Sequence, residues 1–227
     1  SLSIVKNRFD VTFKLQDWQA VKQRFKDGWH VFISNIYTCT YTVSITFFLG
    51  IFTNDTVVGF YSVAEKIAKG VGLIFVPLND ALFPHISKLI AETPGKAVRI
   101  LNKLSFFSLA VMSVVSALMF YFADVIILLV TGDVNLASVT VLKVLSLHPL
   151  VLTLSRIFAN NYLVNFSFQS VLSKIYLYTS LFSLMLIFTL IPMYHGNGAA
   201  VAIMLVEIFA MSYMYVEIRK NILTKLV

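Results

Sequence analysis

Ionisable side chains inside an apolar stretch are the residues most able to do chemistry in this sequence. Residues 59–85 read GFYSVAEKIAKGVGLIFVPLNDALFPH, and Glu65, Lys66 and Lys69 lie within about one turn of a predicted helix. Nine Leu, Ile, Val or Phe residues in 59–78 favour membrane insertion by roughly 3–5 kcal/mol, whereas three central charges oppose it by about 8–10 kcal/mol. We therefore expect these charges to face other helices or a wet cavity.

Helical spacing groups part of this stretch on one polar face. At about 100° per residue, five positions fall within roughly 40° of one another, and Asp80 lies slightly beyond. The five positions are Glu65, Lys69, Gly72, Val76 and Asn79. We expect this face to be the wall of a moving cavity and to look across at something outside this chain.

A purely structural alternative exists for the same face. Glu65 and Lys69 are an i, i+4 pair in the favourable order, so they could simply neutralise each other. Two residues argue for the cavity instead. Lys66 leaves an uncompensated positive charge, and Pro77 removes a backbone hydrogen bond and can kink the helix.

Three more charges fall inside apolar runs. Arg156 precedes several asparagines, and its guanidinium either snorkels to the membrane surface or faces a cavity. Lys143 lies about ten residues from the start of the same predicted span. Glu207 is near the middle of the last predicted span, where a lone carboxylate is a candidate proton site.

No catalytic or metal-binding motif accompanies these charges. The four histidines have no HExxH or other ligand spacing, the serines form no GxSxG motif, and the glycines form no nucleotide fingerprint. The single cysteine, Cys39, is expected to be a small packing residue. We therefore expect no enzyme activity, no metal and no cofactor.

Composition predicts the elements that must position the charges. Of the 227 residues, 58% are hydrophobic and 13% charged, and the mean hydropathy is +0.83, far from the balance of an ordinary soluble domain. Apolar runs long enough to span a bilayer predict an all-α, polytopic membrane protein with six transmembrane helices in one bundle. The predicted spans are about 29–52, 57–90, 104–122, 136–165, 171–193 and 198–218.

Charge predicts the orientation of these spans. Fourteen Lys and Arg residues lie before span one, between spans two and three, before span five or after span six, and none lies in the other three connections. Both termini are therefore expected in the cytoplasm. Residues 1–28 are predicted to be a basic amphipathic linker on the membrane surface, 29–220 the bundle, and 221–227 a cytoplasmic tail. The net charge of +7 is distributed for a membrane and not for nucleic acid.

A short element is expected outside the bundle. Residues 123–130 are too few to cross a membrane again, and they predict either a continuation of the third span or a helix on the outer surface. Gly132 and residues 133–135 mark the turn before span four.

Several of these segments resemble a known family. The runs DGWHVFIS (27–34), FFLGIFTNDTVVGFYSVAEKIAKG (47–70) and PLNDALFPHISKL (77–89) are similar to the carboxy-terminal half of O-antigen type polysaccharide flippases. This family belongs to the multidrug/oligosaccharidyl-lipid/polysaccharide exporter superfamily. The final run GNGAAVAIMLVE is also similar to the family's last helix, so the resemblance covers essentially the whole chain.

The resemblance implies a twelve-helix transporter of two bundles that moves undecaprenyl-pyrophosphate-linked oligosaccharide across the bacterial inner membrane by alternating access. Its anionic headgroup would be met by a set of basic residues, and a coupling proton or sodium ion by a set of acidic ones. The candidate substrate-binding residues are Lys66, Lys69, Arg156 and Lys143. The candidate ion-coupling residues are Glu65, Asp80 and Glu207. Membrane lipids and the polysaccharide polymerase machinery are the implied further partners.

One departure from the family leaves alternatives open. Only six spans are predicted here, so we expect a fragment that lacks the amino-terminal six-helix bundle, although two copies could also associate. The rival functions are a cation-coupled drug exporter of the same superfamily, a membrane enzyme such as a polysaccharide polymerase or ligase, and an inactive half-transporter remnant. The several lysines of the polar stretch favour an anionic substrate.

Overall fold

The computed structural model describes residues 43–224, preceded by six isolated positions: Trp18, Lys22, Phe25, Trp29, Phe32 and Ile36. Within these residues all regular structure is helical, as predicted. The predicted linker 1–28 and the first part of the span 29–52 lie almost wholly outside the described residues. The described end of that span is the helix Val43–Phe52.

The remaining elements follow one another with short connections. Their order is α3 (Asp55–Gly72), η1 (Leu73–Phe75), α4 (Val76–Glu92), α5 (Pro94–Tyr121), α6 (Ala123–Thr131), α7 (Leu136–Val144), η2 (Leu145–Leu147), α8 (His148–Arg156), η3 (Ile157–Val164), α9 (Gln169–Ile218) and η4 (Arg219–Leu223). Of these, η1 and η2 are 3₁₀ segments, whereas η3 and η4 are π-helical.

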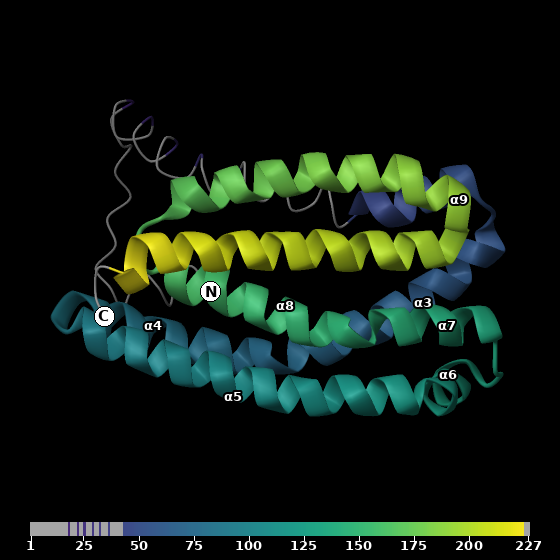
Figure 1. Cartoon of the computed structure of the whole chain (residues 1–227), viewed down its shortest axis with the longest axis horizontal. Helices are drawn as coiled ribbons and strands as arrows, with labels where there is room; N and C mark the ends of the chain where they lie inside the picture. Colours follow the sequence, from purple (N-terminus) through teal and green to yellow (C-terminus); the bar gives the residue numbers. More distant parts are fainter. Residues whose placement is uncertain are drawn as a thin grey trace, which may run out of the picture.

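Four helical stretches of the described chain are long and apolar enough to cross a membrane. They are Asp55–Glu92, Pro94–Tyr121, Leu136–Val164 and Gln169–Leu223. The last is twice the usual length because the chain reverses within it, at His195, whose φ of 49° and ψ of −126° are not helical. Two antiparallel arms result, green and yellow in Figure 1, and they correspond to the predicted spans 171–193 and 198–218.

A glycine makes this reversal possible. A Cβ at position 198 would lie 2.1 Å from the carbonyl oxygen of Leu190, far inside van der Waals contact. Only glycine allows the two arms to approach so closely at their junction.

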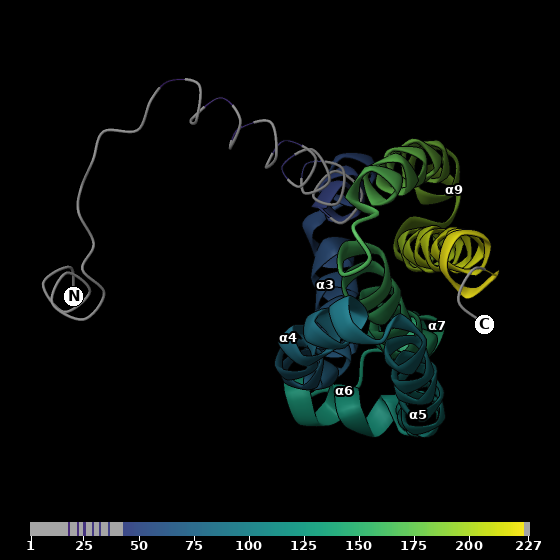
Figure 2. The same ribbon diagram turned by 90° about the vertical axis from the view of Figure 1, so that its left-hand side faces the viewer.

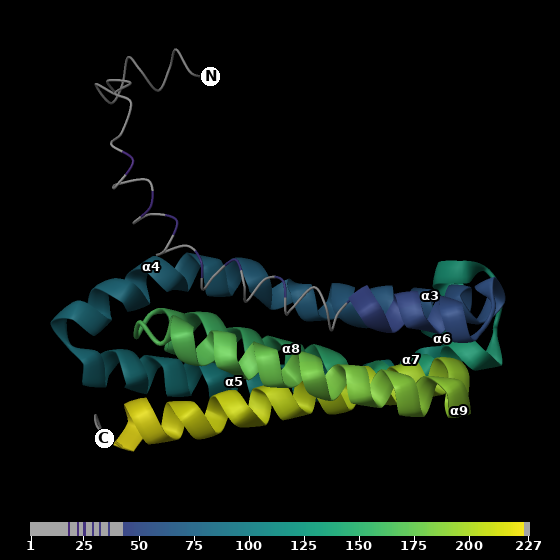
Figure 3. The same ribbon diagram turned by 90° about the horizontal axis from the view of Figure 1, so that it is seen from above.

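The long helices run lengthwise and alternate in direction (Figures 1 and 3). The junction of α4 with α5, the start of α9 and the described carboxy-terminal end meet at one end of the bundle. Seven basic residues lie in these segments: Lys88, Lys96, Arg99, Lys103, Lys174, Arg219 and Lys220. We call this the basic end. The described segments of the opposite end, 53–57, 122–135 and 194–197, contain no Lys or Arg.

Two boundaries differ in detail from the predicted spans. α5 begins at Pro94, ten residues before the predicted start at 104, because a helix can continue beyond its apolar part into a basic, water-exposed extension. Proline at the first helical turn costs no backbone hydrogen bond. The short element after α5 is a separate helix, α6, which ends at Gly132.

Two adjacent helices change their hydrogen-bond pattern at contacting positions. The stretch α3–α4 is interrupted by η1 just before Pro77, and α7–α8 by η2 just before Pro149. A Cβ on Gly72 would lie 2.8 Å from Leu152 Cδ2 and 3.4 Å from Pro149 Cα, so the two helices touch there. The predicted interruption at Pro77 is therefore confirmed, and it has a counterpart on the neighbouring helix.

The apolar core is divided along the bundle. One cluster, the opposite-end core, includes Tyr61, Leu142 and Ile203, and the other, the basic-end core, includes Leu101 and Ile175. The same long helices supply both clusters.

Candidate functional site: two faces of one helix and an interior charge cluster

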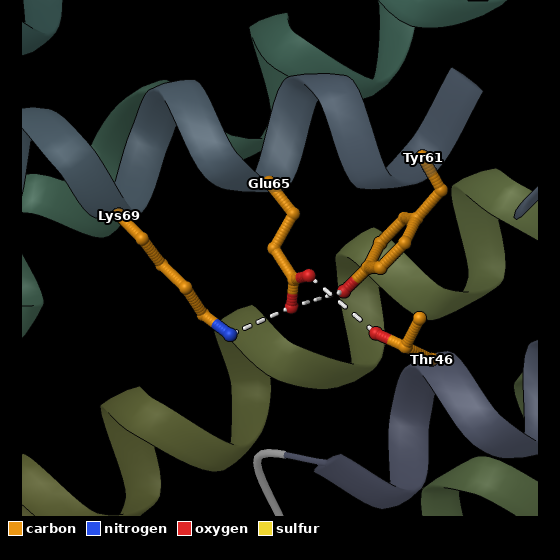
Figure 4. A network of polar contacts seen from close by, with 4 residues as sticks. All are labelled: Thr46, Tyr61, Glu65 and Lys69. Atoms are coloured by element: carbon orange, nitrogen blue, oxygen red, sulfur yellow. Dashed lines mark hydrogen bonds and ion pairs between the residues drawn. The ribbon is translucent and has the colours of Figure 1, made fainter. Parts of the chain in front are cut away.

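The centre of the predicted site is a polar network on α3 (Figure 4). Tyr61, Glu65 and Lys69 project from successive turns, and Thr46 reaches the network from the helix Val43–Phe52. Lys69 Nζ lies 2.9 Å from Glu65 Oε1, which also accepts a hydrogen bond of 3.3 Å from Tyr61 Oη. Thr46 Oγ1 donates to Glu65 Oε2 at 3.4 Å. Both carboxylate oxygens therefore have partners.

Burial makes this pairing energetically significant. Glu65 is buried, whereas the side chain of Lys69 keeps 36% of its surface exposed. A buried carboxylate without a partner would cost several kcal/mol, so the ion pair and two hydroxyl donors stabilise it in place. The structural alternative raised by the i, i+4 spacing is thus realised: Glu65 and Lys69 neutralise each other.

The predicted polar face continues along α4 and packs inside the bundle. Gly72 contacts α8, and Asn79 Oδ1 accepts a hydrogen bond of 3.3 Å from Asn161 Nδ2 on η3. The grouping of these positions on one face is confirmed. The expectation was that this face looks across at something outside this chain. At Glu65, Gly72 and Asn79 it instead packs against helices of the same chain, whereas Lys69 stays partly exposed. We call it the buried stripe.

The other side of α3–α4 is open, and it carries the two remaining charges of the stretch. Lys66 and Asp80 are both exposed. Positions spaced by four, seven, eleven and eighteen residues from Lys66 fall within about 40° of it on a regular helix. They include the small or rigid exposed residues Gly59, Gly70, Pro77 and Pro84, and also the exposed Leu73. We call this set, with Lys66 and Asp80, the open stripe.

The open stripe combines free space with a charge that has no counter-charge in the described chain. A Cβ at Gly59 or Gly70 would meet no atom within 4 Å, so these positions border free space. No ion pair with Lys66 exists among the described residues. A lone lysine near the middle of a membrane helix costs about 2.5–3.5 kcal/mol on the insertion scale, unless water or a partner reaches it.

Glu207 belongs to a separate interior cluster. Its side chain is only 3% exposed on the second arm of α9, and within 43–224 it makes no hydrogen bond. It interacts electrostatically with Lys69 of α3 and with Arg156 of α8. Arg156 is half-buried, and its Nε has no hydrogen-bond partner. Lys69, Arg156 and Glu207 thus lie on three helices that pack against one another.

The predicted residues therefore divide into three groups. Glu65, Lys69, Arg156 and Glu207 point into the bundle, whereas Lys66 and Asp80 lie on the open stripe. Lys143 is the third group by itself. It is exposed on α7, with Nζ 6.0 Å from the ring centroid of Phe120 on α5.

Comparison with known proteins bears directly on this arrangement. The family model of polysaccharide biosynthesis proteins matches residues 1–90, which include α3 and most of α4. A protein named "Putative O-antigen transporter" from Escherichia coli (strain K12) is 28% identical over 205 residues, covering 88% of this chain and 48% of that relative. The chain is similar to O-antigen transporters.

A second relative agrees. A protein of the same printed name from Shigella dysenteriae is 24% identical over 192 residues, covering 83% of this chain and 47% of the relative. The chain thus spans about half the length of these O-antigen transporter relatives. No solved structure matches it.

Three residues near the site were not predicted as part of it. Tyr61 is one turn before Glu65 and could have been found from i, i+4 spacing. Thr46 could not, because its contact depends on how two helices pack. His148 is 1% exposed, interacts electrostatically with Lys69, and has no hydrogen-bond partner on either ring nitrogen. Its neighbour Pro149 gave no sign of this burial.

The described residues offer no metal site, because no group of three or more His, Cys, Asp or Glu residues among them could hold a metal ion. A pocket of about 400 Å³ lies at the opposite end, between α3 and the connection from α6 to α7. Its polar members shape the turns: Asn135 Oδ1 caps α7, and Ser138 Oγ donates to the Phe60 carbonyl.

Proposed function

We propose that this chain forms one six-helix bundle of a transporter that moves an undecaprenyl-pyrophosphate-linked oligosaccharide across the bacterial inner membrane by alternating access. Support comes from the similarity to O-antigen transporters, from the long apolar helices, and from the absence of a catalytic motif in the sequence. Such transport needs no covalent chemistry and no cofactor. The substrate moves while its lipid tail stays in the bilayer.

The open stripe is the observation that carries this proposal. It combines an exposed lysine, an exposed aspartate, two glycines and two prolines along one membrane helix. A lipid-facing surface would be expected to carry no charge. A water-lined path for a hydrophilic headgroup explains the two charges.

Orientation follows from the two ends. The basic end faces the cytoplasm by the positive-inside rule, and the opposite end faces the periplasm. Lys66 is eleven residues from Asp55, so it is about 16 Å along α3 from the periplasmic end, near the middle of a 30 Å hydrocarbon core. A pyrophosphate group crossing the membrane would meet this lysine halfway.

The charged residues then take different roles. Lys66 offsets the negative charge of the headgroup, with Lys69 available nearby through its exposed 36%. Arg156 and Lys143 remain further candidates for anion contact. Among the acidic residues, Glu207 is the strongest candidate for a coupling proton or sodium ion, because its buried carboxylate has no hydrogen-bond partner in the described chain. Glu65 and Asp80 are secondary candidates.

A second bundle is the proposed partner across the open stripe. The chain covers about half of each matched relative, which leaves room for another bundle of similar size in those proteins. The polymerase machinery that receives the oligosaccharide is the further proposed partner.

The test is the variant Lys66→Ala in cells that depend on this protein for surface polysaccharide. We expect surface polysaccharide to fall about tenfold while the lipid-linked precursor accumulates, because an anion contact near the middle of the path is lost. Lys103→Ala removes an exposed lysine from the basic end of α5 and is the matched control, with nearly normal polysaccharide. Normal polysaccharide in Lys66→Ala at equal protein abundance would refute the role of the open stripe, and altered drug susceptibility instead would favour a drug exporter.

A further inference from the structure

One face of α5 changes from basic to apolar along its length. The seven other positions of α5 that fall within about 40° of Lys103 on a regular helix are, like it, all exposed. The whole set is Lys96, Arg99, Lys103, Phe107, Ala110, Val114, Ala117 and Tyr121. We call this face the α5 stripe. Buried residues of α5 such as Leu101 and Met112 lie on the opposite side of the helix.

The apolar part of the α5 stripe is open to its surroundings. α5 runs along the edge of the bundle, so the described chain leaves most of this face uncovered (Figures 1 and 2). Phe107, Val114 and Tyr121 keep 56%, 61% and 77% of their surface exposed. On a helix long and apolar enough to cross a membrane, such side chains indicate contact with lipid tails.

The spacing along the α5 stripe matches one crossing of a bilayer. Lys103 and Tyr121 are about 27 Å apart along the helix, and the hydrocarbon core of a bilayer is about 30 Å thick. Tyrosine is typical of the membrane–water interface. Arg99 and Lys96 lie about 6 and 10 Å beyond Lys103, at the depth of the lipid headgroups. The basic part of the stripe is therefore level with lipid phosphates and the apolar part with the tails.

The three basic residues of the α5 stripe have no acidic partner among the described residues. No ion pair in this part of the chain includes Lys96, Arg99 or Lys103. Glu92, the acidic residue nearest to them in sequence, is instead 4.0 Å from Lys88 Nζ. Like charges three and four residues apart on a helix repel each other. An anion bound beside the first turns of α5 would remove this repulsion.

A ligand for the whole face must be anionic at one end and apolar at the other. An anionic phospholipid meets both requirements, because its phosphate accepts charge-assisted hydrogen bonds from Lys and Arg while its tails pack on Phe107 and Val114. Clusters of Lys and Arg beside a membrane helix attract anionic lipids. A zwitterionic headgroup would bring its own cation among the three basic side chains. A free phosphate ion would satisfy only the basic part.

We propose that the α5 stripe binds an anionic phospholipid of the cytoplasmic leaflet. The lipid phosphate lies beside Arg99, between Lys96 and Lys103, and the tails follow the helix past Phe107. The bound lipid offsets the repulsion among the three cations. This inference concerns the membrane around the bundle. It needs the basic end to face the cytoplasm, but it does not depend on which substrate is transported.

Native mass spectrometry of the purified chain tests the site. The protein in detergent is offered equal amounts of phosphatidylglycerol and phosphatidylcholine with identical tails, and the ratio of the two bound lipids is measured. We expect the unchanged protein to prefer phosphatidylglycerol by at least about tenfold. Combining Lys96→Ala, Arg99→Ala and Lys103→Ala should abolish most of this preference, because the phosphate loses its three partners.

A matched triple variant controls for total charge. Combining Lys174→Ala, Arg219→Ala and Lys220→Ala removes three other exposed cations from the basic end, and should change the preference by less than about twofold. An equal loss in both triple variants would overturn the proposal, because the attraction would then come from net charge. An unchanged protein without any preference would overturn it as well.

A charge-retaining variant guards against misfolding. Lys96→Arg combined with Lys103→Arg keeps three cations on the α5 stripe and should keep the preference, whereas its loss would show that charge is not what holds the lipid. Two other occupants would also contradict the proposal. They are a second copy of the chain, seen as a dimer that only the α5 alanine variant loses, and an added polyprenyl phosphate that displaces phosphatidylglycerol.

Discussion

The two stripes of α3–α4 are built from similar residues but serve different surroundings. The buried stripe pairs its charge and one amide: Glu65 with Lys69, Tyr61 and Thr46, and Asn79 Oδ1 with Asn161. The open stripe leaves Lys66 without an ion pair among the described residues and borders free space at Gly70. Charge on a membrane helix can therefore stabilise the fold on one face and be available for a ligand on the other.

The largest effect is expected from breaking the buried ion pair. Glu65→Ala leaves Lys69 beside apolar helices without its counter-charge, and we expect a loss of about 3 kcal/mol in stability, near the lower end for a buried pair because Lys69 is partly exposed. Thermal unfolding in detergent measures it. The double variant Glu65→Ala, Lys69→Ala removes both charges and should recover part of the loss. Equal stability of the single and double variants would contradict the pairing argument.

The next effect compares two glycines of the same helix. Gly72→Ala places a methyl group 2.8 Å from Leu152 and 3.4 Å from the Pro149 backbone, so we expect a loss of about 1–3 kcal/mol. Gly70→Ala adds the same methyl where nothing lies within 4 Å, and should be neutral or stabilising by up to about 1 kcal/mol. Similar melting temperatures for both variants would mean that the stripes do not differ in packing.

A smaller effect is expected where the buried stripe meets η3. Asn79→Leu leaves the amide of Asn161 without its partner and should cost about 1–2 kcal/mol. Replacing both asparagines by leucine removes the orphaned group as well. The double variant should therefore be at least as stable as the single one, and a double variant that loses twice as much would show that the two amides act independently.

The sequence alone predicted the positions of the helices better than the contacts between them. The apolar runs predicted the long spans, because hydrophobicity depends on local composition, but they left open whether residues 123–130 continue α5 or form the separate helix α6. Helical spacing also grouped Glu65, Gly72 and Asn79 on one face. It could not say what that face touches, since contacts with Thr46, Leu152 and Asn161 depend on tertiary packing.

Because sequence does not show tertiary contacts, it also could not separate the roles of Lys66 and Lys69 in the predicted site. A free charge and a paired charge look alike in sequence, so Lys69 and Lys66 were predicted for one role. The structure separates the two lysines. Lys69 pairs with Glu65, whereas Lys66 is turned about 100° away from Glu65 around the same helix. The burial of His148 without a hydrogen-bond partner could not be anticipated, since an apolar run predicts burial but not which polar groups find partners.

The smallest effect on stability is expected on the open stripe. Lys66→Ala should change the free energy of unfolding by no more than about 0.5 kcal/mol, because the side chain makes no contact that stabilises the bundle. Its effect should be confined to transport. A large loss of thermal stability in this variant would show that Lys66 has a structural partner.

The central claim is that the open stripe faces water and not lipid, and cysteine accessibility measures this directly. Lys66→Cys and Gly70→Cys are compared with Phe106→Cys and Val114→Cys on α5, which are also exposed but belong to an apolar surface. In membrane vesicles with Cys39→Ser, we expect a charged, membrane-impermeant thiol reagent to label the open-stripe positions at least about tenfold faster than the α5 positions. Equal, slow labelling at all four positions would contradict the account, because the open stripe would then be covered by lipid.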